Sequence, residues 1–185
     1  MEELTEAVVA AARAGEPAAL STVFSVLAPR VQAYLAVRGV EDPEGMTSEV
    51  FLQALPRLGT LRAGPSGLRT FVFSIAHARS VDEHRARVRR PRPVSYDPSM
   101  DDRRQASAEA ELVGSLDANG LTSTLATLPE DQRIAITLRV VGDLSLDQTA
   151  ALMGRSVGSV KQLQRRGLLR LRELLTSGQL EVGQP

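Results

Sequence analysis

Basic and amide side chains are concentrated in one short segment towards the end of the chain. Seven groups there can donate hydrogen bonds to phosphate oxygens or base edges: Arg155, Ser156, Ser159, Lys161, Gln162, Arg165 and Arg166. From residue 133 to residue 172 there are eight Arg or Lys and two carboxylates, although the net charge of the whole chain is zero. Neutralisation of nucleic-acid phosphates is a physical reason for such a local excess.

The sequence around this segment predicts two short helices joined by a tight turn. Ser145 and Gln148 have the spacing of a capping box, and Gly154 stands where a left-handed residue would end the first helix. Ser156 then opens a second helix, with Val160 facing inward and the basic residues facing outward. This is the pattern of a helix-turn-helix, whose second helix reads the major groove of DNA. An ordinary helical hairpin with a solvated basic face fits the same spacing, and the charge excess favours DNA binding.

The composition restricts the class of protein. The chain has 185 residues and no cysteine, which excludes disulfides and cysteine-based zinc sites. Apolar residues make up 43% but aromatic residues only 3%, which indicates helices packed through Leu, Val and Ala. We expect no apolar segment of the roughly 20 residues needed to cross a bilayer. The N-terminus is acidic, unlike a signal peptide. A cytoplasmic protein without a membrane partner is predicted.

Helical periodicity and stop signals divide the chain into helices, with no strand pattern. We expect helices at 5–14, 17–39, 42–56 and 66–90, and again at 109–128, 130–142, 145–154 and 156–175. Pro29 should kink or break the second helix, and Ser66 should cap the fourth. The fold prediction is all-α: two small helical domains at 1–93 and 112–177, joined by a flexible linker at 94–111 and followed by a tail at 178–185. The polar, turn-rich stretch 95–108 is the basis for the linker.

Residues that could support catalysis do not form a recognisable set. His77 and His84 lie seven residues apart, whereas two ligands on one helix more often lie four apart. The glycine-rich stretch 59–67 lacks the Lys-Ser/Thr pair that ends a phosphate-binding loop. We therefore predict a protein that is not an enzyme and that has no cofactor and no metal site.

Several motifs resemble the extracytoplasmic-function (ECF) sigma factors of bacterial RNA polymerase, a subfamily of the sigma-70 family. They are Leu128-Pro129, SVGSVK at 156–161 and LRTF at 68–71. The likeness runs from about residue 18 to residue 175 and is most specific over 128–175. It implies that the domain at 1–93 is similar to sigma region 2 and that the domain at 112–177 is similar to sigma region 4.

The resemblance implies three contact surfaces. The −35 promoter element would contact Arg155, Ser156, Ser159, Lys161, Gln162, Arg165 and Arg166. The −10 element would contact Arg62, Ser66, Arg69, His77, Arg79 and Arg85. Core RNA polymerase would contact Glu44, Glu49, Phe51 and Gln53 through the clamp helices of its largest subunit. Melting the −10 element requires a base to leave the stack while arginines hold the backbone. For the carboxylates, a solvated helix face is the alternative.

The resemblance also implies a function and partners. An ECF sigma factor binds core RNA polymerase, including its flap region, and directs promoter recognition, −10 melting and transcription initiation. The expected partners are core polymerase, promoter DNA and an anti-sigma factor, in the bacterial cytoplasm and on the nucleoid within the holoenzyme. Gly45, Phe71 and Ala78 depart from the residues usual in the family, which implies altered −10 preference, weaker polymerase binding or need for an accessory protein. A sigma-like decoy or adaptor, which binds an anti-sigma factor without directing transcription, is the alternative function.

Overall fold

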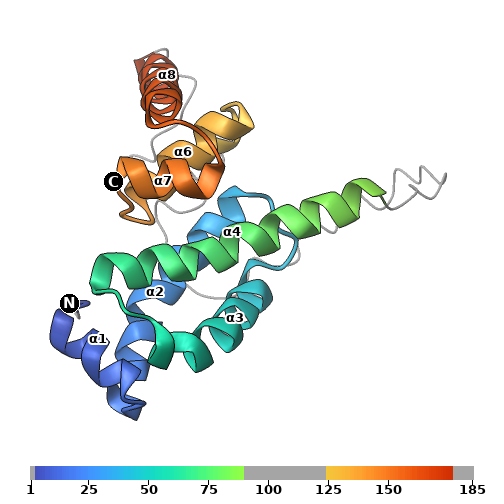
Figure 1. Cartoon of the computed structure of the whole chain (residues 1–185). Helices are drawn as coiled ribbons and strands as arrows, with labels where there is room; N and C mark the ends of the chain where they lie inside the picture. The colour runs from blue at the N-terminus through green and yellow to red at the C-terminus, as the bar shows by residue number, and fades with distance from the viewer. Residues whose placement is uncertain (1–2, 90–123, 177–185) are drawn as a thin grey trace, which may run out of the picture.

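The structure is a computed structural model that describes residues 3–89 and 124–176, and all regular elements in these two ranges are helical (Figure 1). The first range contains α1 (Glu6–Arg13), α2 (Pro17–Val37), α3 (Pro43–Ala54), the 3-10 helix η1 (Leu55–Thr60) and α4 (Pro65–Arg89). The second contains α6 (Glu130–Val140), α7 (Leu146–Met153) and α8 (Val157–Thr176). The linker expected at 94–111, most of the helix expected at 109–128 and the tail expected at 178–185 lie outside the described residues.

Helix α2 is the centre of the first domain. Its side chains Val23, Leu27 and Val31 are fully buried, because α1, α3 and α4 pack around it. Two expectations for this segment are wrong. The helix is not broken at Pro29, which lies inside it, and its 21 residues are long and apolar enough to cross a membrane by length and composition alone. The burial of its apolar side chains against the neighbouring helices identifies it as a core helix.

The ends of the helices in this domain follow the sequence with one exception. Gly39 has φ +73°, as the left-handed end of α2 requires. Asp42 caps α3 by accepting a hydrogen bond from the Gly45 amide at 2.9 Å. The exception is Ser66. Because α4 begins at Pro65, Ser66 lies inside the first turn and is not the N-cap that the sequence predicted.

The second domain is a helix-turn-helix supported by α6. Ser145 and Gln148 form the expected capping box at the start of α7, and Gly154 ends α7 with φ +61°. Ala150 of α7 and Val160 of α8 pack on Ala135 of α6 in a small buried cluster. The tight turn and the small side chains let the two helices cross closely.

The two domains pack directly against each other. Ile134, Leu138 and Leu144 of the second domain belong to the same buried cluster as the core of the first. In Figure 1, α7 lies beside α4 and α6 lies beside α2, in agreement with the contacts between these pairs of helices. Part of the apolar core of the second domain is therefore continuous with that of the first.

Candidate nucleic-acid interface

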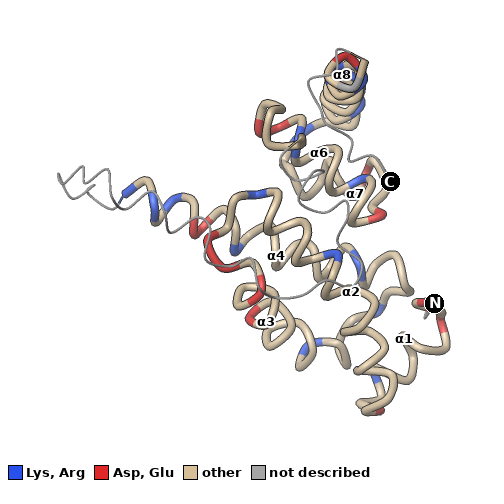
Figure 2. Tube along the Cα trace, turned by 180° about the vertical axis from the view of Figure 1, so that it is seen from behind, with Lys and Arg blue, Asp and Glu red and all other residues tan. Residues whose placement is uncertain are grey.

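Helix α8 separates an apolar face from a basic face. Val160 is fully buried, and Val157 and Leu163 pack beside it on the second domain. On the opposite side lie four basic or amide side chains: Lys161, Gln162, Arg165 and Arg166. Figure 2 shows Lys and Arg positions along α8. The structure therefore brings together, on the solvent side of one helix, four of the seven residues expected to contact the −35 element.

The other three residues of that set lie at the start of α8. The Ser156 hydroxyl accepts a hydrogen bond from the Ser159 amide at 3.2 Å, which caps the helix. Arg155 is exposed and forms an ion pair with Asp131 of α6. Ser159 is half-buried. Both Ser156 and Arg155 therefore have a structural role beside the exposed face of α8. Ser156 caps the helix, and Arg155 connects the start of the helix to α6.

Gly167 is a residue of α8 that sequence reasoning missed. Its position is buried, and a Cβ atom there would lie 2.5 Å from Cδ1 of Ile136. The absence of a side chain lets the middle of α8 approach α6 closely. The sequence signal that could have found it is a glycine inside an otherwise uninterrupted helical pattern, which often has a packing reason.

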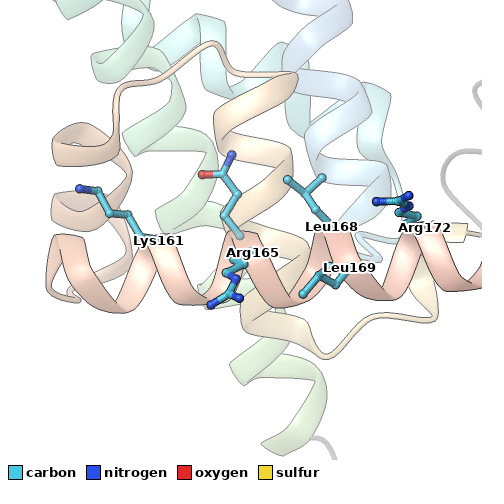
Figure 3. Close-up of a pocket in the computed structure, with 6 residues that line it drawn as sticks. Lys161, Arg165, Leu168, Leu169 and Arg172 are labelled. Atoms are coloured by element: carbon cyan, nitrogen blue, oxygen red, sulfur yellow. The ribbon is translucent and has the colours of Figure 1, made fainter.

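A shallow groove runs along α8 from Lys161 to Arg172 (Figure 3). Its volume is about 430 Å³, and its described lining is Lys161, Gln164, Arg165, Leu168, Leu169 and Arg172. Leu168 and Leu169 are both nearly half exposed. An apolar strip flanked by cations is suited to a partner with apolar and acidic side chains. Sequence reasoning did not single out this strip.

The residues expected to contact the −10 element are divided between solvent and contacts within the protein. Arg62 is exposed in the loop before α4, and Arg85 is exposed towards the end of α4. Ser66 and Arg69 contact the second domain: the Ser66 hydroxyl accepts from Nε2 of Gln148 at 2.8 Å, and Nη1 of Arg69 lies 2.8 Å from the Asp143 carboxylate.

His77 and Arg79 also have partners within the protein. Nδ1 of His77 lies 2.7 Å from the Tyr34 hydroxyl, and burial lowers the pKa of the imidazole below its usual 6.5. Arg79 forms an ion pair with Glu49 of α3, a residue expected to contact polymerase. A residue expected to contact the −10 element is therefore paired with a residue expected to contact polymerase.

The surface expected to contact polymerase is only partly as predicted. Glu49 is exposed, Glu44 lies at the first turn and Gln53 is half-buried, all on α3. Phe51 is only 2% exposed and packs edge-on against Phe24 at a centroid distance of 4.8 Å, so its placement on a contact surface was wrong. It faces inward because Phe24 and the core hold it.

Two exposed apolar side chains near this face were not predicted. Leu52 of α3 is 74% exposed, and Phe24 of α2 is 44% exposed. Phe24 and Glu44 also line a groove of about 300 Å³ between α2 and α3. Exposed apolar side chains beside carboxylates are typical of a protein-binding surface rather than of a nucleic-acid surface.

Comparisons with known proteins identify relatives of this chain. The family model for sigma-70 region 4 matches residues 119–171, which include the helix-turn-helix. The ECF RNA polymerase sigma factor SigD of Mycobacterium tuberculosis is 33% identical over 187 residues, covering 95% of this chain and 86% of that protein. This chain belongs to the ECF RNA polymerase sigma factors.

Other relatives of this sigma factor agree. The ECF sigma factor BldN of Streptomyces coelicolor is 29% identical, covering 89% of this chain and 63% of that protein. Among solved structures, CnrH in complex with the cytosolic domain of CnrY has a TM-score of 0.62 at 20% identity, covering 95% of this chain and 99% of that chain. RpoE from Bartonella quintana, solved with the anti-sigma factor NepR, has a TM-score of 0.60 at 21% identity, covering 83% and 94%. These structures show that the all-α fold is that of sigma factors.

Proposed function

We propose that this sigma factor joins core RNA polymerase, recognises promoters through both domains, opens the −10 element and so directs transcription initiation. The observation that carries the proposal is the solvent face of α8. It presents two arginines, a lysine and a glutamine from the second helix of a helix-turn-helix. In this motif that helix enters the major groove.

Recognition of the −35 element follows from the chemistry of these side chains. Arg165, Arg166 and Lys161 can donate to guanine O6 and N7 or to phosphates, and Gln162 can pair with adenine. Ser156 and Ser159, at the start of α8, would donate to backbone phosphates together with Arg155. For Arg155 this requires exchange of its Asp131 partner for a phosphate oxygen, which a guanidinium binds equally well.

The first domain would hold the −10 element along α4. Arg62 and Arg85 are exposed cations at the two ends of this surface, with Ser66, Arg69, His77 and Arg79 between them. Arginines would fix the backbone of a single strand while an unstacked base enters a pocket. Ala78 is exposed on this helix, where an asparagine is usual, so one polar base contact is missing and the −10 preference should differ accordingly.

Polymerase would be bound by the α3 face and by the strip on α8. Glu44, Glu49 and Gln53 would face the clamp helices of the largest subunit, with Leu52 as an apolar anchor. Gly45 is explained by packing, because a Cβ there would lie 2.2 Å from the Asp42 carboxylate that caps α3. Leu168 and Leu169 would face the flap region.

An anti-sigma factor is the proposed regulatory partner. Support comes from a protein with the same fold, RpoE of Bartonella quintana, whose solved structure is a complex with the anti-sigma factor NepR. The place of action would be the bacterial cytoplasm, with association to the nucleoid when the protein is in the holoenzyme.

Selection of promoters by the reconstituted holoenzyme tests the proposal. Core polymerase with this chain should enrich DNA fragments that share two short elements at a fixed spacing and that support run-off transcripts. A decoy or adaptor would bind an anti-sigma factor yet enrich no fragments and initiate no transcripts. The basic solvent face of α8 favours the sigma factor, since a decoy does not need it.

A further inference from the structure

Helix α1 contacts the loop that carries residues assigned to the −10 element. Arg62 lies in the stretch between η1 and α4, and Ser66 lies in the first turn of α4. The residue after Arg62 is Ala63, whose carbonyl accepts a hydrogen bond from Nη2 of Arg13 at the end of α1. Arg13 and Ala63 are 50 residues apart in the chain, so the tertiary fold brings them together.

A second side chain of α1 contacts the next residue of the loop. Glu6 lies seven residues before Arg13, which is about two turns of the helix, so the two side chains share one side of α1. The Glu6 carboxylate packs directly on Gly64, because a Cβ atom there would lie 2.2 Å from its Oε1. Helix α1 thus contacts Ala63 and Gly64, the two loop residues that follow Arg62.

Helix α1 is a firm support for the loop because its other side is part of the core. Val9 is 1% exposed and Ala12 is 3% exposed, and both belong to the buried cluster of the first domain. The Arg13 side chain is half-buried, and its Nε is shielded from solvent. The guanidinium is therefore packed in place, and a hydrogen bond from a charged donor is stronger than one between neutral groups.

The loop depends on such contacts because residues 61–64 belong to no helix. A segment without regular structure keeps its conformational freedom unless other parts of the protein fix it. Gly67 of α4 fixes Ala63 from the side opposite its carbonyl, since a Cβ atom at Gly67 would lie 2.3 Å from Cβ of Ala63. Ala63 is thus held at its carbonyl by Arg13 and at its methyl group by Gly67.

A fixed loop favours DNA binding in two ways. A loop that is ordered before binding does not lose its conformational freedom when DNA arrives, so the affinity is higher. A rigid site also discriminates between bases better than a loose one, because the contacting groups stay within a narrow range of positions. Arg62 and Ser66, on either side of Ala63 and Gly64, gain both advantages.

We propose that Arg13 is a positioning residue for the −10 element. It holds the loop from Arg62 to Ser66 in the conformation that receives single-stranded DNA, and it does not contact the DNA itself. Glu6 and Gly67 complete the support by packing on Gly64 and Ala63. This proposal rests on the proposed function, because it takes the −10 role of Arg62 and Ser66 as given.

The test compares the full chain carrying Arg13→Ala with the full chain carrying Arg30→Ala. Arg30 is a half-buried arginine of α2 that has no hydrogen bond to the loop within the described ranges, so its removal changes the net charge equally. The first readout is cleavage by trypsin after Arg62, followed by mass spectrometry and expressed relative to cleavage at the other arginines of the first domain. This relative rate should be at least about fivefold higher for Arg13→Ala than for the control. Equal rates would overturn the support of the loop.

The second readout is binding of a pool of random single-stranded 20-mers at several salt concentrations, with sequencing of the bound strands. Arg13→Ala should bind about fivefold more weakly than the control and should enrich a less defined base pattern. The dependence of log affinity on log salt should be the same in the two variants. A direct phosphate contact by Arg13 would instead lower this slope by about one, and that result would overturn the positioning role. Affinity and base preference equal to those of the control would overturn it as well.

Gly67→Ala tests the same loop from α4 and leaves Arg13 in place. Alanine is the better helix former, so the fold is retained, while the added methyl group displaces Ala63. Faster cleavage after Arg62 and a less defined base pattern are expected. Wild-type behaviour of this variant in both readouts would contradict the proposal even if Arg13→Ala does not fold.

Failure of the proposed function is distinguishable from failure of this proposal. The former shows as absence of run-off transcripts when the wild-type chain is combined with core polymerase. The support of the loop by Arg13 is measured by the cleavage rate, which requires neither DNA nor polymerase.

Discussion

The hydroxyl of Tyr34 lies 2.7 Å from Nδ1 of His77, in the core beneath α4. Tyr34 is fully buried, and burial raises the pKa of its phenol to about 12, so the hydroxyl is protonated near neutral pH. It forms a hydrogen bond with Nδ1 of the imidazole. His77 therefore provides a hydrogen-bond partner for a buried polar group of the first domain.

This pair predicts a loss of stability in mild acid. Burial, together with the charge of Arg38, lowers the pKa of His77 in the folded protein, so the unfolded chain binds the proton more readily. The free energy of unfolding should not change with this group above about pH 7, and it should fall as the pH drops through 6.5 towards the pKa of His77 in the folded protein. The loss is about 1.4 kcal/mol for each pH unit by which the pKa in the folded protein lies below that in the unfolded chain.

Thermal unfolding of the wild type and of His77→Asn at pH 7.5 and 5.5 measures this effect. Asparagine places an acceptor near the position of Nδ1 but does not titrate, so the variant should lose less stability on acidification. An equal loss in the two proteins would show that groups other than His77 cause the acid sensitivity.

Arg166→Ala should weaken binding of the −35 duplex by about 1–3 kcal/mol, the range for an arginine that contacts a base. Thermal stability should stay unchanged, because the side chain is exposed. Fluorescence anisotropy with a duplex taken from the promoter selection measures the affinity. Arg57→Ala, an exposed arginine of η1 in the other domain, is the control for charge. Equal losses of affinity in the two variants would leave Arg166 without a specific role.

Glu49→Ala should lower the affinity for core polymerase about fivefold or more, because it removes a carboxylate from the α3 face. Binding of the −35 duplex should not change, since Glu49 belongs to the first domain. Because Glu49 also pairs with Arg79, Arg79→Ala is measured beside it. If the ion pair alone matters, both variants lose affinity equally. If Glu49 contacts polymerase directly, Glu49→Ala lowers the affinity for core polymerase more than Arg79→Ala does.

The turn of the helix-turn-helix offers a matched pair of glycines. Gly154→Ala should destabilise the protein by about 1 kcal/mol, because its φ of +61° strains any residue with a Cβ. Gly158 lies in α8 with open space where a methyl group would be added. Gly158→Ala should therefore stabilise the protein by about 0.4–1 kcal/mol. Denaturant unfolding of the two variants measures the change in the free energy of unfolding that each substitution causes. Changes of the same sign in both would contradict the assigned turn geometry.

Local sequence signals predicted the helices and the helix-turn-helix well. The Ser145–Gln148 capping box and the left-handed Gly154 depend on neighbouring residues only, so their pattern is visible in the sequence. The basic solvent face of α8 follows from the same helical period, since Val160 fixes which side is buried.

The predictions that were wrong concern residues whose environment depends on distant segments of the chain. Phe51 was assigned to the polymerase surface by the family resemblance, but it is buried against Phe24 of another helix. Ser66 is a good N-cap by type, yet Pro65 begins the helix and Gln148, 82 residues later, binds its hydroxyl. The contact between the two domains has no local signal, because Arg38 and Glu130 are 92 residues apart and each is an ordinary charged residue in its own segment.

Run-off transcription tests the central claim most directly. Purified chain and core polymerase are combined on a promoter recovered by selection, and transcripts are compared with those from core enzyme alone. The account predicts transcripts of one defined start site that appear only with the chain and that Arg166→Ala reduces. Stable binding of the chain to core polymerase or to an anti-sigma factor, with no transcript from any recovered template, would contradict it.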